Sequence, residues 1–211
     1  EYANAFNERD NGACWEKDDP DQNPWVWERK FEVDSLCYPV QLAYLLWKNT
    51  GCTSQFDENF HKGVEKIFHV FKTEQFHEEK SEYRFRRQNA FFRDTLSRDG
   101  KGALVKSGTG LIWSGFRPSD DACTYGYLIP SNMFVVVIMG YLEELARELF
   151  HDEQLEKDAK LLKEQVREAV EKEGRANTEE FGMVYAYETD GYGMYNLMDD
   201  ANVPSLLGME Y

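Results

Sequence analysis

The sequence predicts a mainly α-helical protein in which helical hairpins alternate with long loops. Apolar residues recur at helical spacing in four segments, approximately 35–49, 58–75, 132–150 and 152–173. Gly51 and Gly174 follow two of these segments, as glycine commonly does at helix ends. Aromatic and acidic residues gather in the long loops between the hairpins. This order of helix, turn, helix and long loop favours an α/α toroid whose loops lie together on one face.

The elements follow in order along the chain. The polar segment 1–24 predicts a loop, and Asp34 is expected to cap the first helix. The second helix carries Val64, Ile67 and Phe71 on one face, and residues 83–95 alternate as an extended segment would.

The second half of the chain predicts a buried helix, a charged helix and a hairpin. The run Met133–Met139 is apolar throughout, which indicates a helix buried on several sides, and at seven residues it is too short to span a membrane. The helix at 152–173 is amphipathic and highly charged. Residues 181–188 predict a short β-hairpin arm, and Asn202 and Pro204 predict the start of another helix. No linker interrupts the chain, so residues 1–211 are expected to belong to a single domain.

The composition excludes several classes of partner. The 211 residues carry a formal net charge of −15 and a pI near 4.7. Nucleic acids and anionic membrane surfaces are bound by basic faces, so neither is expected as a partner. Aromatic residues make up 15% of the chain, which indicates a large core, a carbohydrate-binding groove, or both.

No metal or cofactor is expected. Three histidines, His61, His69 and His77, recur every eight residues, a spacing that turns by about 80° per step on a helix and does not converge on an ion. The four cysteines form no CxxC pair and no zinc pattern. Dispersed cysteines of this kind indicate free thiols in a reducing cytoplasm.

The segment 113–123, WSGFRPSDDAC, is the main candidate for a functional site. It places two aromatic residues, Trp113 and Phe116, beside Arg117 and the adjacent carboxylates Asp120 and Asp121. Aromatic walls with carboxylates and a fixed positive charge are typical of a sugar-binding pocket. The same residues are also compatible with a helix N-terminus, because acidic residues are favoured there. The residues of this loop alone leave both interpretations open.

Two other loops have a similar composition. Trp25 and Trp27 lie beside Glu28, Lys30 and Asp34 and could form the wall of a sugar subsite, although a packed loop and a capped helix would look the same.

The third loop contains Asp199, Asp200 and Asn202, which could bring a further carboxylate to the mouth of the same site. Helix capping is again the simpler alternative.

Five longer segments resemble glycoside hydrolase family 125. These are WERKFEVDSLCYPV, WSGFRPSDDAC, YGYLIPSNMF, VYAYETDGYG and MDDANVPSLLG, at 27–40, 113–123, 125–134, 184–193 and 198–208. The resemblance covers essentially the whole chain. It implies an exo-acting α-1,6-mannosidase that inverts anomeric configuration, built on an (α/α)6 toroid with short β-hairpin arms in its loops.

The resemblance also implies which residues act. The family's general acid falls on Asp120, and seven further residues are expected to line or support the pocket: Arg117, Asp121, Trp113, Lys30, Asp34, Asp200 and Asn202. A family segment containing Trp-Leu-Arg-Asp-Ser and the Glu that serves as general base have no match here. The chain is therefore expected to be about half of the catalytic domain, inactive by itself, with the base outside it.

The partner implied by the resemblance is an α-1,6-mannoside, from trimmed N-glycan cores or from mannan, and the location implied is the bacterial cytoplasm. Two alternatives remain open. One is a non-catalytic module that binds mannosides, and the other is a helical toroid that hydrolyses a different sugar.

Overall fold

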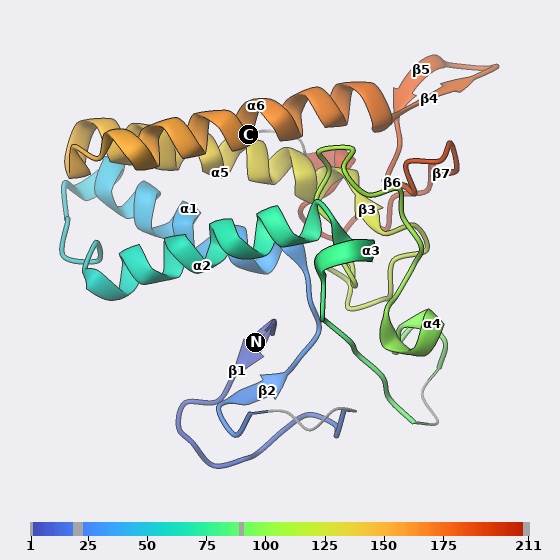
Figure 1. Cartoon of the computed structure of the whole chain (residues 1–211), viewed down its shortest axis with the longest axis horizontal. Coiled ribbons are helices and arrows are strands. Elements are labelled where there is room, and N and C mark those ends of the chain that lie inside the picture. Colours follow the sequence, from blue (N-terminus) through green and yellow to red (C-terminus); the bar gives the residue numbers. More distant parts are fainter. Residues whose placement is uncertain (1, 19–22, 89–90, 209–211) are drawn as a thin grey trace.

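Two helical hairpins form the body of the molecule (Figure 1). The computed structural model describes residues 2–18, 23–88 and 91–208. The first hairpin consists of α1 (Val33–Thr50) and α2 (Glu58–Glu74), and the second of α5 (Ile129–Leu145), a π-helical turn (Ala146–Phe150) and α6 (Glu153–Glu173). The four helices expected from the sequence are thus confirmed. Helix α5 packs against both α1 and α6.

The first helix begins earlier than the sequence suggested, and Asp34 does not cap it. Glu32 occupies the cap position, with an extended backbone and no side-chain capping bond. Asp34 lies inside the first turn, is buried, and accepts a hydrogen bond from Ser131 Oγ at 3.2 Å. The expected N-cap is wrong because this carboxyl connects α1 to α5. Gly51 ends the helix with a left-handed backbone, as expected.

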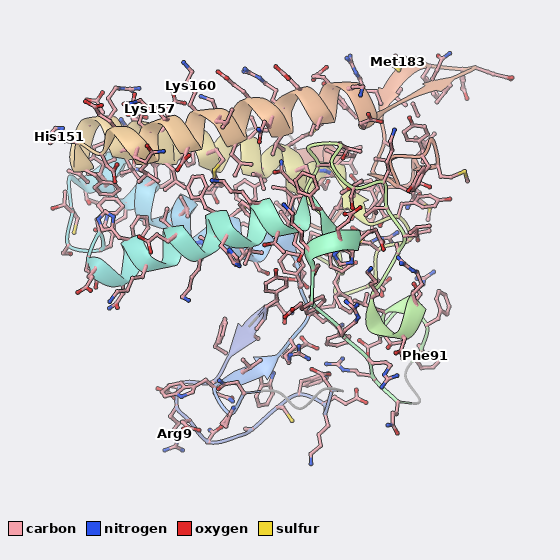
Figure 2. The ribbon with its side chains drawn as sticks, viewed as in Figure 1. Arg9, Phe91, His151, Lys157, Lys160 and Met183 are labelled. Atoms are coloured by element: carbon pink, nitrogen blue, oxygen red, sulfur yellow. The ribbon has the colours of Figure 1, made fainter. Side chains whose placement is uncertain are left out.

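Helix α5 is the central helix of the structure. Phe134, Val135, Ile138, Met139 and Leu142 are all fully buried, as expected for a run that is apolar on every side. By length and composition alone, the segment Ile129–Phe150 could cross a membrane, contrary to our expectation from its longest apolar run. Most of this segment is buried against the rest of the fold, as in the core helix of a globular protein. Helix α6 covers it, and Lys157 and Lys160 point outward from α6 in Figure 2.

The strands are short. The two nearest the N-terminus lie beneath α2, and the others lie at the end of the hairpins opposite their connecting turns (Figure 1). They form three antiparallel units: β1 (Ala5–Phe6) with β2 (Val26–Glu28); β3 (Tyr127–Leu128) with β6 (Glu188–Thr189) and β7 (Tyr195–Asn196); and β4 (Arg175–Thr178) with β5 (Gly182–Tyr185). The expected arm at 181–188 is therefore split between two sheets. The short helices α3 (His77–Lys80) and α4 (Ser97–Gly100) lie at the same end.

Two further expectations need correction. Residues 83–95 alternate as predicted, with Tyr83, Phe85 and Arg87 buried, but their described part belongs to none of the three sheets. The helix expected after Asn202 is only a 3-10 turn at Leu206–Gly208, and residues 209–211 of that prediction lie outside the described residues.

Trp113 is packed in the core between the helices and the loops. It is 1% exposed, and its indole stacks on the His77 ring with 3.6 Å between ring centroids. Two loop glycines, Gly102 and Gly126, lie directly against it. These close approaches require glycine because a methyl group would overlap the indole.

We therefore expect Gly126→Ala to destabilise the protein by about 1–3 kcal/mol, since overpacking a core costs this much. The added methyl would overlap both Trp113 and Val105. Gly63→Ala is the matched control, because a methyl on this α2 residue meets nothing within 4 Å and alanine favours helix. Urea unfolding measures both. Equal stability of the Gly126 variant and the parent would contradict the packing described.

Candidate functional site around Asp120

The segment 116–122 folds into a tight turn at the end of the hairpins where the long loops lie. Phe116 and Ala122 pair as a β-bridge, and the Arg117 amide donates to the Asp121 carbonyl at 2.9 Å. The Asp120 amide donates back to the Arg117 carbonyl at 2.9 Å. No helix begins here, because the chain continues into β3 before α5. Helix capping, the alternative interpretation of this segment, is therefore wrong.

Asp120 lies at the tip of this turn with its carboxyl in the open. Its side chain is 59% exposed, and its backbone has φ +66, in the left-handed region. That conformation costs a non-glycine residue on the order of 1–2 kcal/mol, so surrounding contacts must hold it. The exposed position differs from the shielded pocket between Trp113 and Phe116 that the sequence suggested, since both rings are buried.

Lys30 is the contact that holds the Asp120 backbone. Its ammonium donates to the Asp120 carbonyl at 2.8 Å and pairs with Asp94 at 2.7 Å. It also lies 5.1 Å from the centre of the Phe116 ring and 3.9 Å from the Asp120 carboxyl. Only 5% of the Lys30 side chain is exposed, so Lys30 supports the turn from inside the protein. Its contacts are those of a residue that supports the turn, one of the two roles expected for it.

Arg117 holds the turn from the other side. Its Nε donates to Glu188 Oε1 at 2.6 Å, and its guanidinium lies over the Tyr187 ring. Arg117 therefore points toward Glu188 and Tyr187, and it supports the turn. Glu188 is fully buried and also accepts from the amides of Thr124 and Tyr125.

Sequence reasoning missed Glu188. The only signal is an acidic residue within the aromatic segment VYAYETDG, at the end of the predicted hairpin arm. Buried carboxylates need a charged partner, and Arg117 supplies it.

Asp200 joins the third loop to the same turn. Its two carboxyl oxygens accept from Ser119 Oγ and from the Tyr187 hydroxyl, both at 2.7 Å. Burial acts to raise the pKa of Asp200, but these hydrogen bonds and the amide of Asn202 hold it below its ordinary value. The Asn202 side chain lies nearby and donates to the Asp200 carbonyl at 3.3 Å. The structure thus brings the two acidic loops together, with Asp200 in a supporting position.

The remaining candidates divide into exposed and buried residues. Asp121 is partly exposed and lies 3.4 Å from Arg93 across an ion pair. Trp27 on β2 and Trp25 directly before it are exposed, by 37% and 50%. Trp113 presents no face to a ligand, so its expected role as a pocket wall is corrected to a core residue.

Asp34 is buried below the turn. Burial raises its pKa to about 6, partly offset by hydrogen bonds from its own backbone and from Ser131.

Across residues 2–18, 23–88 and 91–208, no three His, Cys, Asp or Glu side chains are grouped so as to hold a metal ion. Cys14, Cys37, Cys52 and Cys123 are all free thiols.

We expect Arg117→Ala to cost about 3–5 kcal/mol, because it leaves the Glu188 charge buried without its partner. Arg175→Ala is the control, since its ion pair with Glu171 is solvent-exposed and worth at most about 1 kcal/mol. Unfolding free energies of both variants, measured at pH 7, provide the test. Equal effects of the two substitutions would show that the Arg117–Glu188 pair does not hold the turn.

Comparison with known proteins identifies the family. A family model described as metal-independent alpha-mannosidase (GH125) matches residues 1–211. The meiotically up-regulated gene 157 protein of Schizosaccharomyces pombe is 34% identical over 227 aligned residues, covering 100% of this chain and 44% of the relative.

A solved structure gives the same result. It is a metal-independent α-mannosidase of Streptococcus pneumoniae in a non-productive complex with α-1,6-mannobiose. It superposes with a TM-score of 0.93 at 49% identity, covering 98% of this chain and 49% of that one. The chain thus spans about half the length of the proteins it matches. It belongs to glycoside hydrolase family 125, the family of metal-independent α-mannosidases.

Proposed function

We propose that the whole protein removes terminal α-1,6-linked mannose with inversion of configuration, using Asp120 as general acid. The observation that carries the proposal is the Asp120 carboxyl, presented in the open on a turn that Lys30 and the Arg117–Glu188 pair fix from two sides. The solved relative was obtained with α-1,6-mannobiose, which supports this linkage. Trimmed N-glycan cores or α-1,6-linked mannan are the substrates we propose, and the bacterial cytoplasm is the proposed location.

The proposed chemistry needs two carboxyl groups on opposite sides of the scissile bond. Asp120 gives its proton to the glycosidic oxygen as the bond to the anomeric carbon breaks. A second carboxylate, roughly 6.5–9.5 Å away in inverting enzymes, activates water on the opposite face of the sugar. We assign no described residue as this base and propose that the rest of the domain supplies it. Holding the acid in place is then the contribution of this chain.

We also propose an (α/α)6 toroid, of which this chain forms about half. Helix α5 is buried on nearly all sides, while α6 is charged on its outer face, as expected of inner and outer helices. Helix α1 leaves Leu42, Leu45 and Leu46 exposed, with Leu42 at 70%. An apolar stripe on a helix next to the core indicates a surface that another helix covers in the complete domain.

The test of function uses the full-length protein and α-1,6-mannobiose. We expect mannose release, with the first product anomer seen by NMR being that of inversion. Asp120→Asn should lower kcat by about 10²–10⁴-fold, because an amide cannot supply the proton. Asp121→Asn, the neighbouring carboxyl in the same turn, is the matched control and should lose far less.

Other results would point to other functions. A folded protein that binds mannobiose without cleaving it would support the non-catalytic binding module. Cleavage of a different glycoside in preference to the mannoside would support a toroid hydrolase of another specificity. Equal losses in the Asp120 and Asp121 variants would overturn the assignment of the acid.

The 211 residues expressed alone should hydrolyse no mannoside and should self-associate. The reasons are the exposed leucine face of α1 and the second catalytic carboxylate, which we assign to none of the described residues. Light scattering after size-exclusion chromatography measures the association. A monomer that melts cooperatively would contradict this prediction.

A further inference from the structure

Glu32 lies beside Asp120 and shares a hydrogen-bond donor with it. The Asn4 side-chain amide nitrogen is 3.5 Å from Glu32 Oε1 and 3.3 Å from Asp120 Oδ1. Ser35 Oγ donates to the other Glu32 oxygen at 2.8 Å, which fixes the carboxyl at the start of α1. The two acids differ in exposure, because Glu32 is 8% exposed while Asp120 faces outward.

The surroundings of Glu32 are mostly acidic. Asp34 is on the same helix, and Glu28 of β2 accepts from the same Asn4 nitrogen at 3.2 Å. The ammonium of Lys30, which lies 4.0 Å from Glu28 and 3.9 Å from Asp120, is engaged by Asp94 and the Asp120 carbonyl.

Three further groups face the same region. Lys66 and His69 of α2 line a cavity together with Glu32. The Tyr83 hydroxyl also interacts electrostatically with Glu32. Their effect is smaller than that of the acids. Burial first, then the charge of Asp34 and the charge and hydrogen bond of Asp120, raise the pKa of Glu32 to about 8, against a lowering by Ser35.

We propose that Glu32 is a positioning residue for the general acid: Glu32 and Asp120 hold one proton between them, and Glu32 keeps that proton available to Asp120 at neutral pH. This inference rests on the proposed role of Asp120. Two carboxyl groups held close together by a common donor do not both ionise easily, so such a pair retains its last proton to a higher pH than a single acid does.

The proton balance is simple. Asp120 transfers the shared proton to the glycosidic oxygen, which takes the electrons of the breaking bond and leaves as the alcohol. The pair, now without a proton, takes one up from solvent before the next turnover. Glu32 neither touches the sugar nor forms a bond to it.

The first test is the pH–rate profile of the full-length protein on α-1,6-mannobiose. In Glu32→Gln the basic limb of kcat should move down by at least one pH unit, while kcat on the acidic side stays within about threefold. Glu32→Asp keeps a carboxyl group, so the basic limb of its kcat profile should return most of the way to the pH at which it lies in the parent protein. The control Glu78→Gln should leave the limb unchanged, because Glu78 pairs with Arg98 and Lys101 away from the turn.

The second test does not depend on activity. A carboxyl whose pKa is raised from 4.5 to about 8 by folding binds more protons in the folded state, so stability falls as pH rises between those values. Glu32→Gln removes this fall, and its melting temperature relative to the parent should increase steadily from pH 4.5 to 8.

Glu78 provides the opposite case for the same measurement. Its hydrogen bonds with Arg98, and then with Lys101, lower its pKa to about 2, so its contribution is constant above pH 4.5 and lost as pH falls toward 2. Glu78→Gln should therefore show a pH-independent loss of stability from pH 5 to 9.

The outcomes separate the two proposals. If the parent protein releases no mannose, the proposed function fails, and the melting series alone decides the carboxyl pair. A basic limb that stays in place in Glu32→Gln, with or without a rise in KM, would overturn the role of Glu32. A melting difference that does not change with pH would overturn the shared proton.

Discussion

The position of Asp120 depends on the buried ion pair between Arg117 and Glu188. Glu188 lies on β6, and the strand is fixed because β6 pairs with β3 and β7 on either side. Arg117 belongs to the turn and is held by its ion pair with this strand. Asp200 adds a second connection to the turn through Ser119. A buried pair of this kind is rarely a source of stability, since both charges are desolvated. Its value here is geometric: it determines where an exposed carboxyl on a strained backbone stands.

The opposite side of the turn is held by different chemistry. Lys30 donates a hydrogen bond to the carbonyl of Asp120 and lies 3.9 Å from its carboxyl, so its main effect is to stabilise the left-handed backbone. Arg87 in turn fixes the acids around Lys30 by pairing with Asp94 and Glu28. The turn is therefore held firmly on the side that faces the protein and is open on the side that faces solvent. That combination suits a proton donor that must meet a substrate oxygen arriving from solvent.

Much of the fold could be predicted from the sequence, because four helices are marked by periodic apolar residues and by local end signals such as Gly51. The site was less accessible because its contacts are long-range. An aspartate near a helix start looks the same whether it caps the helix or binds a second helix, and only the position of Ser131 shows that Asp34 does the latter. Likewise, burial in the core and exposure in a groove demand the same residue type, so Trp113 was ambiguous until its contact with His77 was known.

If Asp120 is the general acid, as proposed, the two carboxyl groups beside Asn4 explain why it stands at an edge. A fully buried acid would keep its proton but could not reach a glycosidic oxygen, while an isolated exposed acid would reach it but lose its proton below neutral pH. Placing an exposed carboxyl beside a buried one would separate these requirements between two residues. Glu32, fixed by Ser35 at the start of α1, meets the first requirement, and Asp120, raised on its turn, meets the second. The shared donor on Asn4 keeps the two carboxyl groups close together, as the proposal requires.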